Sequence, residues 1–333
     1  MSIDPQFYLS LYSEANLGKT DDWSSFKNYR KGDLELTNKI DEILNNYFEE
    51  TDKFDVSGYI APSIYVSQSF DSREAVIAKN FIRRTGNIFK NRKKDKPVYA
   101  SLIISRETLL DQKEFEEFLN DITMLEDPPD GFYVIIASRT SGSKSDIYHA
   151  DVIANWMMLN LSLSINGFQV INGYSDILSP FLGAAGAYAG ASGWWTNLQM
   201  FSMERFFPKK GGGRQPIVRY LSKQFLNRVT FSEKDTIANF VPAVINGLPC
   251  DTHYSEGEPD RKYEILQSWE ALNALISETD QSLQSCNDAV INAQSLYADW
   301  NRIGLPLDPK SDGKHLEALL EGIRLYKKRA QLD

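Results

Sequence analysis

Residues 168–219 read FQVINGYSDILSPFLGAAGAYAGASGWWTNLQMFSMERFFPKKGGGRQPIVR. The alternation of apolar and polar residues predicts a strand, a short helix, a second strand and a second helix, followed by a basic glycine-rich loop. Small residues stand where two backbones must approach closely. In parallel α/β proteins a helix returns the chain between successive strands, so this order is typical of that class.

The same alternation extends to the N-terminus. We expect strands at residues 7–12, 58–66, 98–104, 132–137, 168–172, 187–191 and 217–220, the second of them interrupted by Pro62. We expect helices at residues 33–50, from 72 toward the Lys90 cluster, and at 112–125, 149–165 and 196–206. After about residue 222 the pattern predicts helices alone: one capped by Ser232, one long helix or a broken pair over 261–302, and one at 315–328.

The strand count favours a barrel-like architecture. About seven parallel strands with polar residues at their carboxyl ends fit a complete or incomplete (β/α)8-like barrel. A doubly wound parallel sheet is the alternative, but no glycine-rich dinucleotide turn follows the first expected strand. We therefore expect a β/α barrel-like domain at residues 1–230 and a C-terminal helical region at 231–333.

Composition limits the function classes. The 333-residue chain has a net charge of -9, so we expect no general attraction to nucleic acid or anionic lipid. Its two cysteines, Cys250 and Cys286, lie outside any disulfide or zinc spacing, which indicates a reducing compartment. The first residues lack the basic region of a signal peptide. These features together predict a cytoplasmic protein.

One nearly uncharged stretch raises the question of whether the chain spans a membrane. Between Asp151 and Glu204 the single charged residue is Asp176, which leaves uncharged runs long enough to span a bilayer at about 20 residues each. The first run holds several asparagines, and the second holds Pro180 and glycines, so insertion would bury many amides and a broken backbone. We therefore expect a buried soluble core and no membrane association.

Two carboxylates are candidate catalytic residues. Asp176 follows a predicted central strand and is the only charge in an apolar stretch, where a carboxylate is either ion-paired or raised in pKa for proton transfer. Capping of the next short helix is the alternative role for Asp176. Glu14 follows the first predicted strand and could act as the second carboxylate of an acid and base pair.

Three arginines are candidate contacts for an anion. Arg106 and Arg139 each follow a serine at the end of consecutive predicted strands, so their forked donors could clamp one anionic group. Salt bridges to Glu14 or Asp176 are the alternative. Arg219 lies in the last predicted strand of the sheet and joins them as a third candidate.

Aromatic and glycine-rich segments add further candidates. Trp195 follows the sixth predicted strand and could stack on a sugar or base, with packing in the core as the alternative. Lys210 and Arg214 flank three glycines, an arrangement that would form a lid over a phosphate. An ordinary surface loop is the alternative, since no helix begins directly after the glycines.

These candidates predict a protein that binds an anionic small molecule with a nucleotide or sugar part. It would be an enzyme or an enzyme-derived protein. The three histidines lack metal-ligand spacing and no serine-nucleophile motif occurs, so we expect neither a metal nor another cofactor.

The alternative function is a non-catalytic scaffold subunit of a larger complex. Its C-terminal helices would dock a partner protein or a second copy of the chain, through an apolar stripe that includes Leu266 and Trp269. Packing of this stripe on the barrel is the simpler explanation. Nucleic-acid binding through the basic loops at 90–96 and 209–214 is the weakest alternative.

Overall fold

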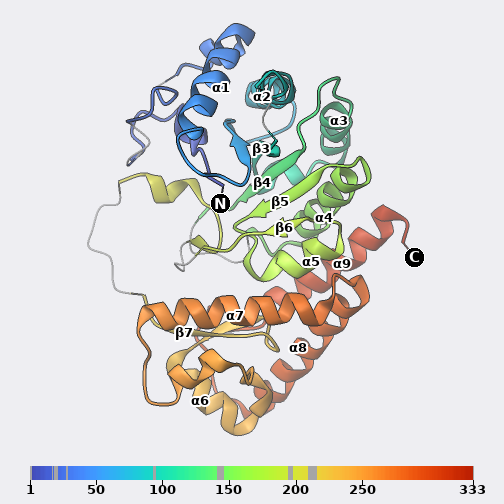
Figure 1. The fold of residues 1–333 in the computed structure, drawn as a ribbon. Helices are drawn as coiled ribbons and strands as arrows, with labels where there is room; N and C mark the ends of the chain where they lie inside the picture. Colours follow the sequence, from blue (N-terminus) through green and yellow to red (C-terminus); the bar gives the residue numbers. More distant parts are fainter. Residues whose placement is uncertain are drawn as a thin grey trace.

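The computed structural model describes residues 2–16, 18, 22–27, 29–92, 95–140, 146–193, 198–208 and 216–332. Within these residues the chain is an α/β protein with a six-stranded parallel sheet and a separate two-stranded hairpin (Figure 1). The strands of the parallel sheet are β1 (Tyr59–Ala61), β2 (Tyr65–Val66), β3 (Val98–Ser105), β4 (Gly131–Ala137), β5 (Gln169–Gly173) and β6 (Ala189–Gly190). As predicted, Pro62 interrupts one strand, and its two parts β1 and β2 both pair with β3.

The strands lie side by side in the order of the chain, from β1 through β3, β4 and β5 to β6. The predicted alternative, a doubly wound sheet, is therefore wrong, because the strand order of such a sheet reverses at a switch point. Within the described residues β1 and β6 do not pair with each other, so the sheet is open. The α-helices of this part of the chain form an arc around it (Figure 1). They are α1 (Thr37–Thr51), α2 (Arg73–Lys90), α3 (Gln112–Thr123), α4 (Ala150–Ile165) and α5 (Ser179–Ala184).

The two faces of the sheet have different coverings. Asn172 of β5 accepts a hydrogen bond from Trp156 Nε1 of α4 at 2.6 Å, so the Asn172 face is the helix side. Because successive side chains alternate between faces, Tyr133, which neighbours the Asn172 partner Val134, points to the opposite face. We call this the open face only to distinguish it from the helix side; its side chains are buried too. Every residue of β3 and β4 is buried, which shows that both faces are covered.

Two segments distant in sequence cover the open face. The 3-10 helix η1 (Phe7–Leu9) places the Tyr8 ring 5.1 Å from the Phe201 ring, and Ser138 N donates to Phe201 O at 2.9 Å. The predicted first strand at 7–12 is therefore wrong. Gln6 has a left-handed backbone with φ 50° that turns the chain, and η1 is buried on all sides.

The predicted helix at 196–206 is also wrong in its described part. Phe201 forms a parallel bridge with Ala137 at the end of β4. No α-helix occurs in the described part, residues 198–206, where Met203–Phe206 forms the short 3-10 helix η8. Backbone pairing to the sheet has replaced helical hydrogen bonds at this point.

From residue 216 to 332 the chain forms a hairpin and four α-helices (Figure 1). They are β7 (Arg219–Ser222), β8 (Asn227–Thr230), α6 (Phe231–Phe240), α7 (Arg261–Thr279), α8 (Leu283–Ile303) and α9 (His315–Ala330). The predicted seventh parallel strand is wrong, because β7 pairs with β8 in antiparallel fashion. The predicted cap at Ser232 is corrected to Thr230, which forms a capping box with Glu233. The division of the chain at residues 230 and 231 stays a prediction.

The C-terminal helices α8 and α9 pack against helices that cover the sheet, α8 against α5 and α9 against α4. Helix α9 lies against α4, where a Cβ on Gly322 would sit 2.8 Å from Ile153 Cβ. The long helical stretch is a broken pair, since Asp280 and Gln281 both adopt left-handed backbone between α7 and α8. Among the described residues, no helix combines the length and apolar character that crossing a membrane requires.

Candidate functional site

Two arginines follow neighbouring parallel strands, offset by one residue in register. Ser105 at the end of β3 pairs with Ala137 at the end of β4, so the residues that follow emerge side by side. After β3, Ser105 Oγ accepts a hydrogen bond from Thr108 N at 3.4 Å and starts the 3-10 helix η4 (Arg106–Leu109). This turn fixes Arg106 at the carboxyl edge of the sheet, where ligands of parallel α/β proteins bind.

Glu107 joins the two arginines. Its Oε1 accepts a hydrogen bond from Arg139 Nε at 2.5 Å and lies 3.8 Å from Arg106 Nη1. The structure thus brings Arg106 and Arg139 together, with Glu107 as the shared carboxylate and neither Glu14 nor Asp176 between them. We call these three residues the arginine rim.

The two arginines differ in the exposure of their side chains and in their hydrogen bonds. The Arg139 side chain is 61% exposed, whereas that of Arg106 is 9% exposed. Arg106 Nε is buried without a hydrogen-bond partner among the described residues. Its contact with Glu107 at 3.8 Å is longer than a hydrogen bond. A guanidinium carries five N–H donors, so Arg106 retains donors for a further acceptor.

Two tyrosines belong to the surroundings of the rim. The pKa of Tyr65, on β2, is raised by burial and further by electrostatic interaction with Tyr12 and with the Glu107 carboxylate. Tyr65 is therefore a neutral phenol near the shared carboxylate. The Tyr12 ring packs 5.7 Å from Phe207, at the edge of the segment that covers the open face.

Asp176 forms a different contact, with the C-terminal hairpin. Arg228 donates to its two carboxylate oxygens at 2.6 and 2.8 Å, and Ser192 Oγ donates at 2.9 Å. Burial acts to raise the pKa of Asp176, but the Arg228 charge and these hydrogen bonds outweigh it and hold the pKa below its usual value. Asp176 is therefore an ionised, paired carboxylate that joins the end of β5 to β8.

Glu14 does not accompany Asp176. It lies exposed beyond η1, because the strand that was expected to carry it is absent. Among the described residues, no hydrogen bond or ion pair connects Glu14 with Asp176. Their use as a catalytic pair stays a prediction.

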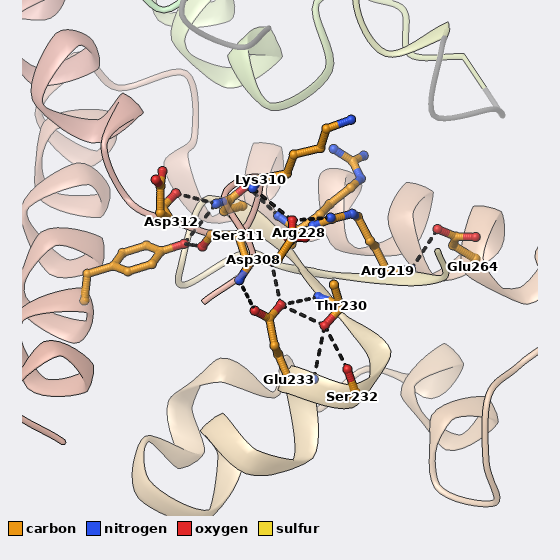
Figure 2. Close-up of polar contacts among 12 residues, drawn as sticks. Arg219, Arg228, Thr230, Ser232, Glu233, Glu264, Asp308, Lys310, Ser311 and Asp312 are labelled. Carbon is orange, nitrogen blue, oxygen red and sulfur yellow. Dashed lines mark hydrogen bonds and ion pairs between the residues drawn. The ribbon is translucent and has the colours of Figure 1, made fainter. Parts of the chain in front are cut away.

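Arg219 lies in a buried polar network of the C-terminal part (Figure 2). Its Nη2 donates to Asp308 at 2.6 Å and its Nη1 donates to Ser311 Oγ at 3.1 Å. Ser311 in turn donates to Glu233 at 2.6 Å. The network fastens the loop before α9 to the hairpin, so the structure does not bring Arg219 to the arginine rim.

The other predicted site residues are Trp195, Lys210 and Arg214, and they lie outside the described residues. Their stacking and lid roles stay predictions. Within the described ranges no group of three or more His, Cys, Asp or Glu side chains is placed to hold a metal ion.

Sequence reasoning missed Glu107 and a cluster on the open face. Glu107 directly follows Arg106 in the sequence. An acidic residue next to a predicted anion-binding arginine was a signal that the arginine has an ion-pair partner within the protein. The cluster comprises Asp4, Tyr8, Tyr133, Tyr174 and Arg205. The position of Tyr133, one residue out of phase with the helix-facing Val134, was the available signal for it.

Comparisons with known proteins do not supply a family. No family model and no curated protein matches the chain. Among solved structures the chain is similar to dihydrodipicolinate synthase from Oceanobacillus iheyensis, with 13% identity over 98% of this chain and 88% of that one. The TM-score of 0.23 is too low for this match to establish a common fold or activity.

Proposed function

We propose that the protein binds an anionic small molecule, with a nucleotide or sugar part, at the arginine rim, and that its open sheet is a partial (β/α) barrel. The observation that carries the proposal is the buried Arg106, whose Nε has no hydrogen-bond partner among the described residues. A buried donor without a partner costs about 1–3 kcal/mol. An anionic ligand that accepts from Arg106 would recover this free energy.

The geometry suggests how the anion enters. Glu107 occupies the position between the two guanidinium groups, so its carboxylate acts as an internal substitute for the anion. Arg139 is exposed and can rotate toward a ligand, whereas Arg106 is fixed by burial. A phosphate or carboxylate would take the place of the Glu107 carboxylate between them. The proposal assigns binding to this rim and leaves open whether a reaction follows.

Calorimetric titration tests the proposal. The ligands are inorganic phosphate, ribose 5-phosphate and adenosine monophosphate, with ribose and adenosine as their uncharged counterparts. We expect the phosphorylated compounds alone to bind, and Arg106→Gln to weaken binding by about 10- to 100-fold, since a charge-assisted hydrogen bond contributes about 1.5–3 kcal/mol. Arg324→Gln is the matched control, because Arg324 lies on the exposed surface of α9 in a local pair with Glu321. Equal affinity of the wild type and a folded Arg106→Gln variant would refute the proposal.

One observation supports the second candidate function, a scaffold role. Leu266 and Trp269 of α7 are 43% and 40% exposed, whereas Leu272 and Leu275 further along the helix are buried. The predicted apolar stripe is thus divided, with its first part available to a partner. Light scattering of the double variant Leu266→Ser, Trp269→Ser tests self-association: an unchanged molar mass, together with unchanged retention of co-purifying proteins, would count against this role.

A further inference from the structure

A second group of ionisable side chains lies on the open face of the sheet, away from the arginine rim. Asp4 and Tyr8 come from the N-terminal segment, Tyr133 from β4, Tyr174 from the end of β5, and Arg205 from η8. Tyr133 is the third residue of β4, whereas Arg139 lies two residues beyond the end of that strand. The cluster therefore shares no residue with the arginine rim.

The carboxyl group of Asp4 lies between two phenols. Asp4 Oδ2 is 3.4 Å from Tyr8 Oη and 3.5 Å from Tyr133 Oη, while Oδ1 accepts from Gln6 N at 3.0 Å. Contacts of 3.4 to 3.5 Å are long for hydrogen bonds between oxygens, which prefer about 2.7 Å. Catalytic hydrogen bonds are commonly long before a ligand binds and shorten around it.

An arginine is fixed beside these groups. Arg205 Nη2 donates to Tyr174 Oη at 2.8 Å. Its guanidinium lies over the rings of Phe206, Tyr174 and Phe201 at 4.7, 4.8 and 5.2 Å. Its positive charge also acts on the Asp4 carboxyl group. The cation is thus held in place next to the acid.

The backbone next to the cluster has two residues in left-handed conformation and one closely packed glycine. Gln6 and Tyr174 adopt left-handed backbone with φ 50° and 58°, a conformation that costs non-glycine residues about 1 kcal/mol or more. Gly173 provides room for the phenol, because a Cβ at this position would lie 2.7 Å from Tyr133 Oη. Strained residues and close approaches of this kind are concentrated at functional sites.

The electrostatic environment agrees with the geometry. Burial raises the pKa of Asp4, and this effect exceeds the opposing effects of the Gln6 hydrogen bond and the Arg205 charge. Burial likewise raises the pKa of Tyr8 and Tyr133 well above the usual value, and the pKa of Tyr174 is also raised. The phenols are therefore neutral donors. Asp4 keeps its proton to a higher pH than an exposed aspartate, although part of its surface reaches solvent.

We propose that Asp4, Tyr8 and Tyr133 form a proton-transfer site for a small carbonyl or hydroxyl compound. The two phenols donate hydrogen bonds to one oxygen of the ligand, and Asp4 exchanges a proton with that oxygen. When the ligand oxygen is an alkoxide or enolate, the O–H bond of Asp4 breaks as the O–H bond of the ligand forms. The negative charge passes to Asp4, where Arg205 stabilises it.

Ligand-observed NMR tests the site with uncharged probes, namely dihydroxyacetone, glycolaldehyde and glycerol. We expect at least one probe to bind the wild type, and Asp4→Asn and Tyr133→Phe to weaken it at least tenfold. Tyr99→Phe is the control, because the Tyr99 phenol donates to Gln169 at 2.7 Å and is not part of the cluster. Absence of binding by all three probes, or binding that the two variants leave unchanged, would overturn the proposal.

Carbon-13 NMR of aspartate-labelled protein separates a proton-transfer role from a structural one. We expect the Asp4 carboxyl signal, assigned by its loss in Asp4→Asn, to titrate at a higher pH than exposed aspartates and to shift when the probe binds. A signal that the probe does not move would contradict the proposal. Arg106→Gln should leave these results unchanged, so failure of the anion site and failure of this site can be told apart.

Discussion

Arg228 donates to both carboxylate oxygens of Asp176, at 2.6 and 2.8 Å, and so connects β8 with the end of β5. The two residues are 52 positions apart in the chain, and both side chains are buried. A buried ion pair of this kind fixes how two segments meet. Its loss leaves one charge buried without its partner, which is the costly outcome.

The first prediction concerns this pair. Arg228→Met should lower the free energy of unfolding by about 3–5 kcal/mol, because Asp176 would stay buried without its counter-ion. The double variant Arg228→Met, Asp176→Leu should recover part of this loss, since no charge is then left uncompensated. Urea denaturation measures both. A double variant that is less stable than Arg228→Met would contradict the explanation.

The second prediction is the acid dependence of stability. The folded pKa of Asp176 lies below its usual value of 3.8, so the folded state binds this proton less readily than the unfolded state. The stability that Asp176 contributes is complete above pH 3.8 and is lost as the pH falls toward the lower folded pKa. The difference in stability between the wild type and Asp176→Asn should therefore shrink in this acid range. A difference independent of pH would show that the carboxylate is not ionised in the fold.

The third prediction concerns the contact of α9 with α4. Alanine usually stabilises a helix by about 1 kcal/mol relative to glycine. At Gly322, however, the added Cβ would lie 2.8 Å from Ile153 Cβ, so Gly322→Ala should lower stability by about 1–3 kcal/mol. Gly183→Ala in α5 is the matched control, because its nearest neighbour is at 3.7 Å. Thermal unfolding of the two variants should shift in different directions, and a gain of stability for both would refute close packing at Gly322.

The sequence predicted the central sheet because burial is uniform there. Residues 98–105 and 131–137 are uncharged and mostly apolar, and all of them are buried, as parallel strands covered on both faces require. The proximity of Arg106 and Arg139 at one edge of the sheet also followed from the sequence, since parallel strands bring their carboxyl ends together. These inferences need only local patterns and the parallel arrangement.

Long-range pairing explains what the sequence did not reveal. Phe7, Tyr8 and Leu9 look like a strand until Gln6 is seen to turn the chain, and a left-handed glutamine has no sequence signature. Residues 217–220 have strand composition, but composition does not distinguish an antiparallel partner from a parallel one. Arg228 likewise gives no local sign that it pairs with Asp176.

The fourth prediction follows from the cost of holding Arg106 at the rim. In the absence of ligand, Arg106→Met should not lower the free energy of unfolding, and it should raise it by up to about 3 kcal/mol, because a buried and poorly satisfied cation is replaced by an apolar side chain. Arg228→Met is the contrasting variant, since that cation has a bidentate partner. Equal destabilisation by the two changes would show that Arg106 is a structural residue.

The most direct measurement of anion binding is the free energy of unfolding of the wild type and of Arg106→Met, with and without ribose 5-phosphate. A ligand that binds only the folded state stabilises it by about 2.7 kcal/mol at 100 times its dissociation constant. We predict that ribose 5-phosphate stabilises the wild type and has no effect on Arg106→Met. Stabilisation of both proteins to the same extent would contradict the assignment of Arg106 as the anion contact.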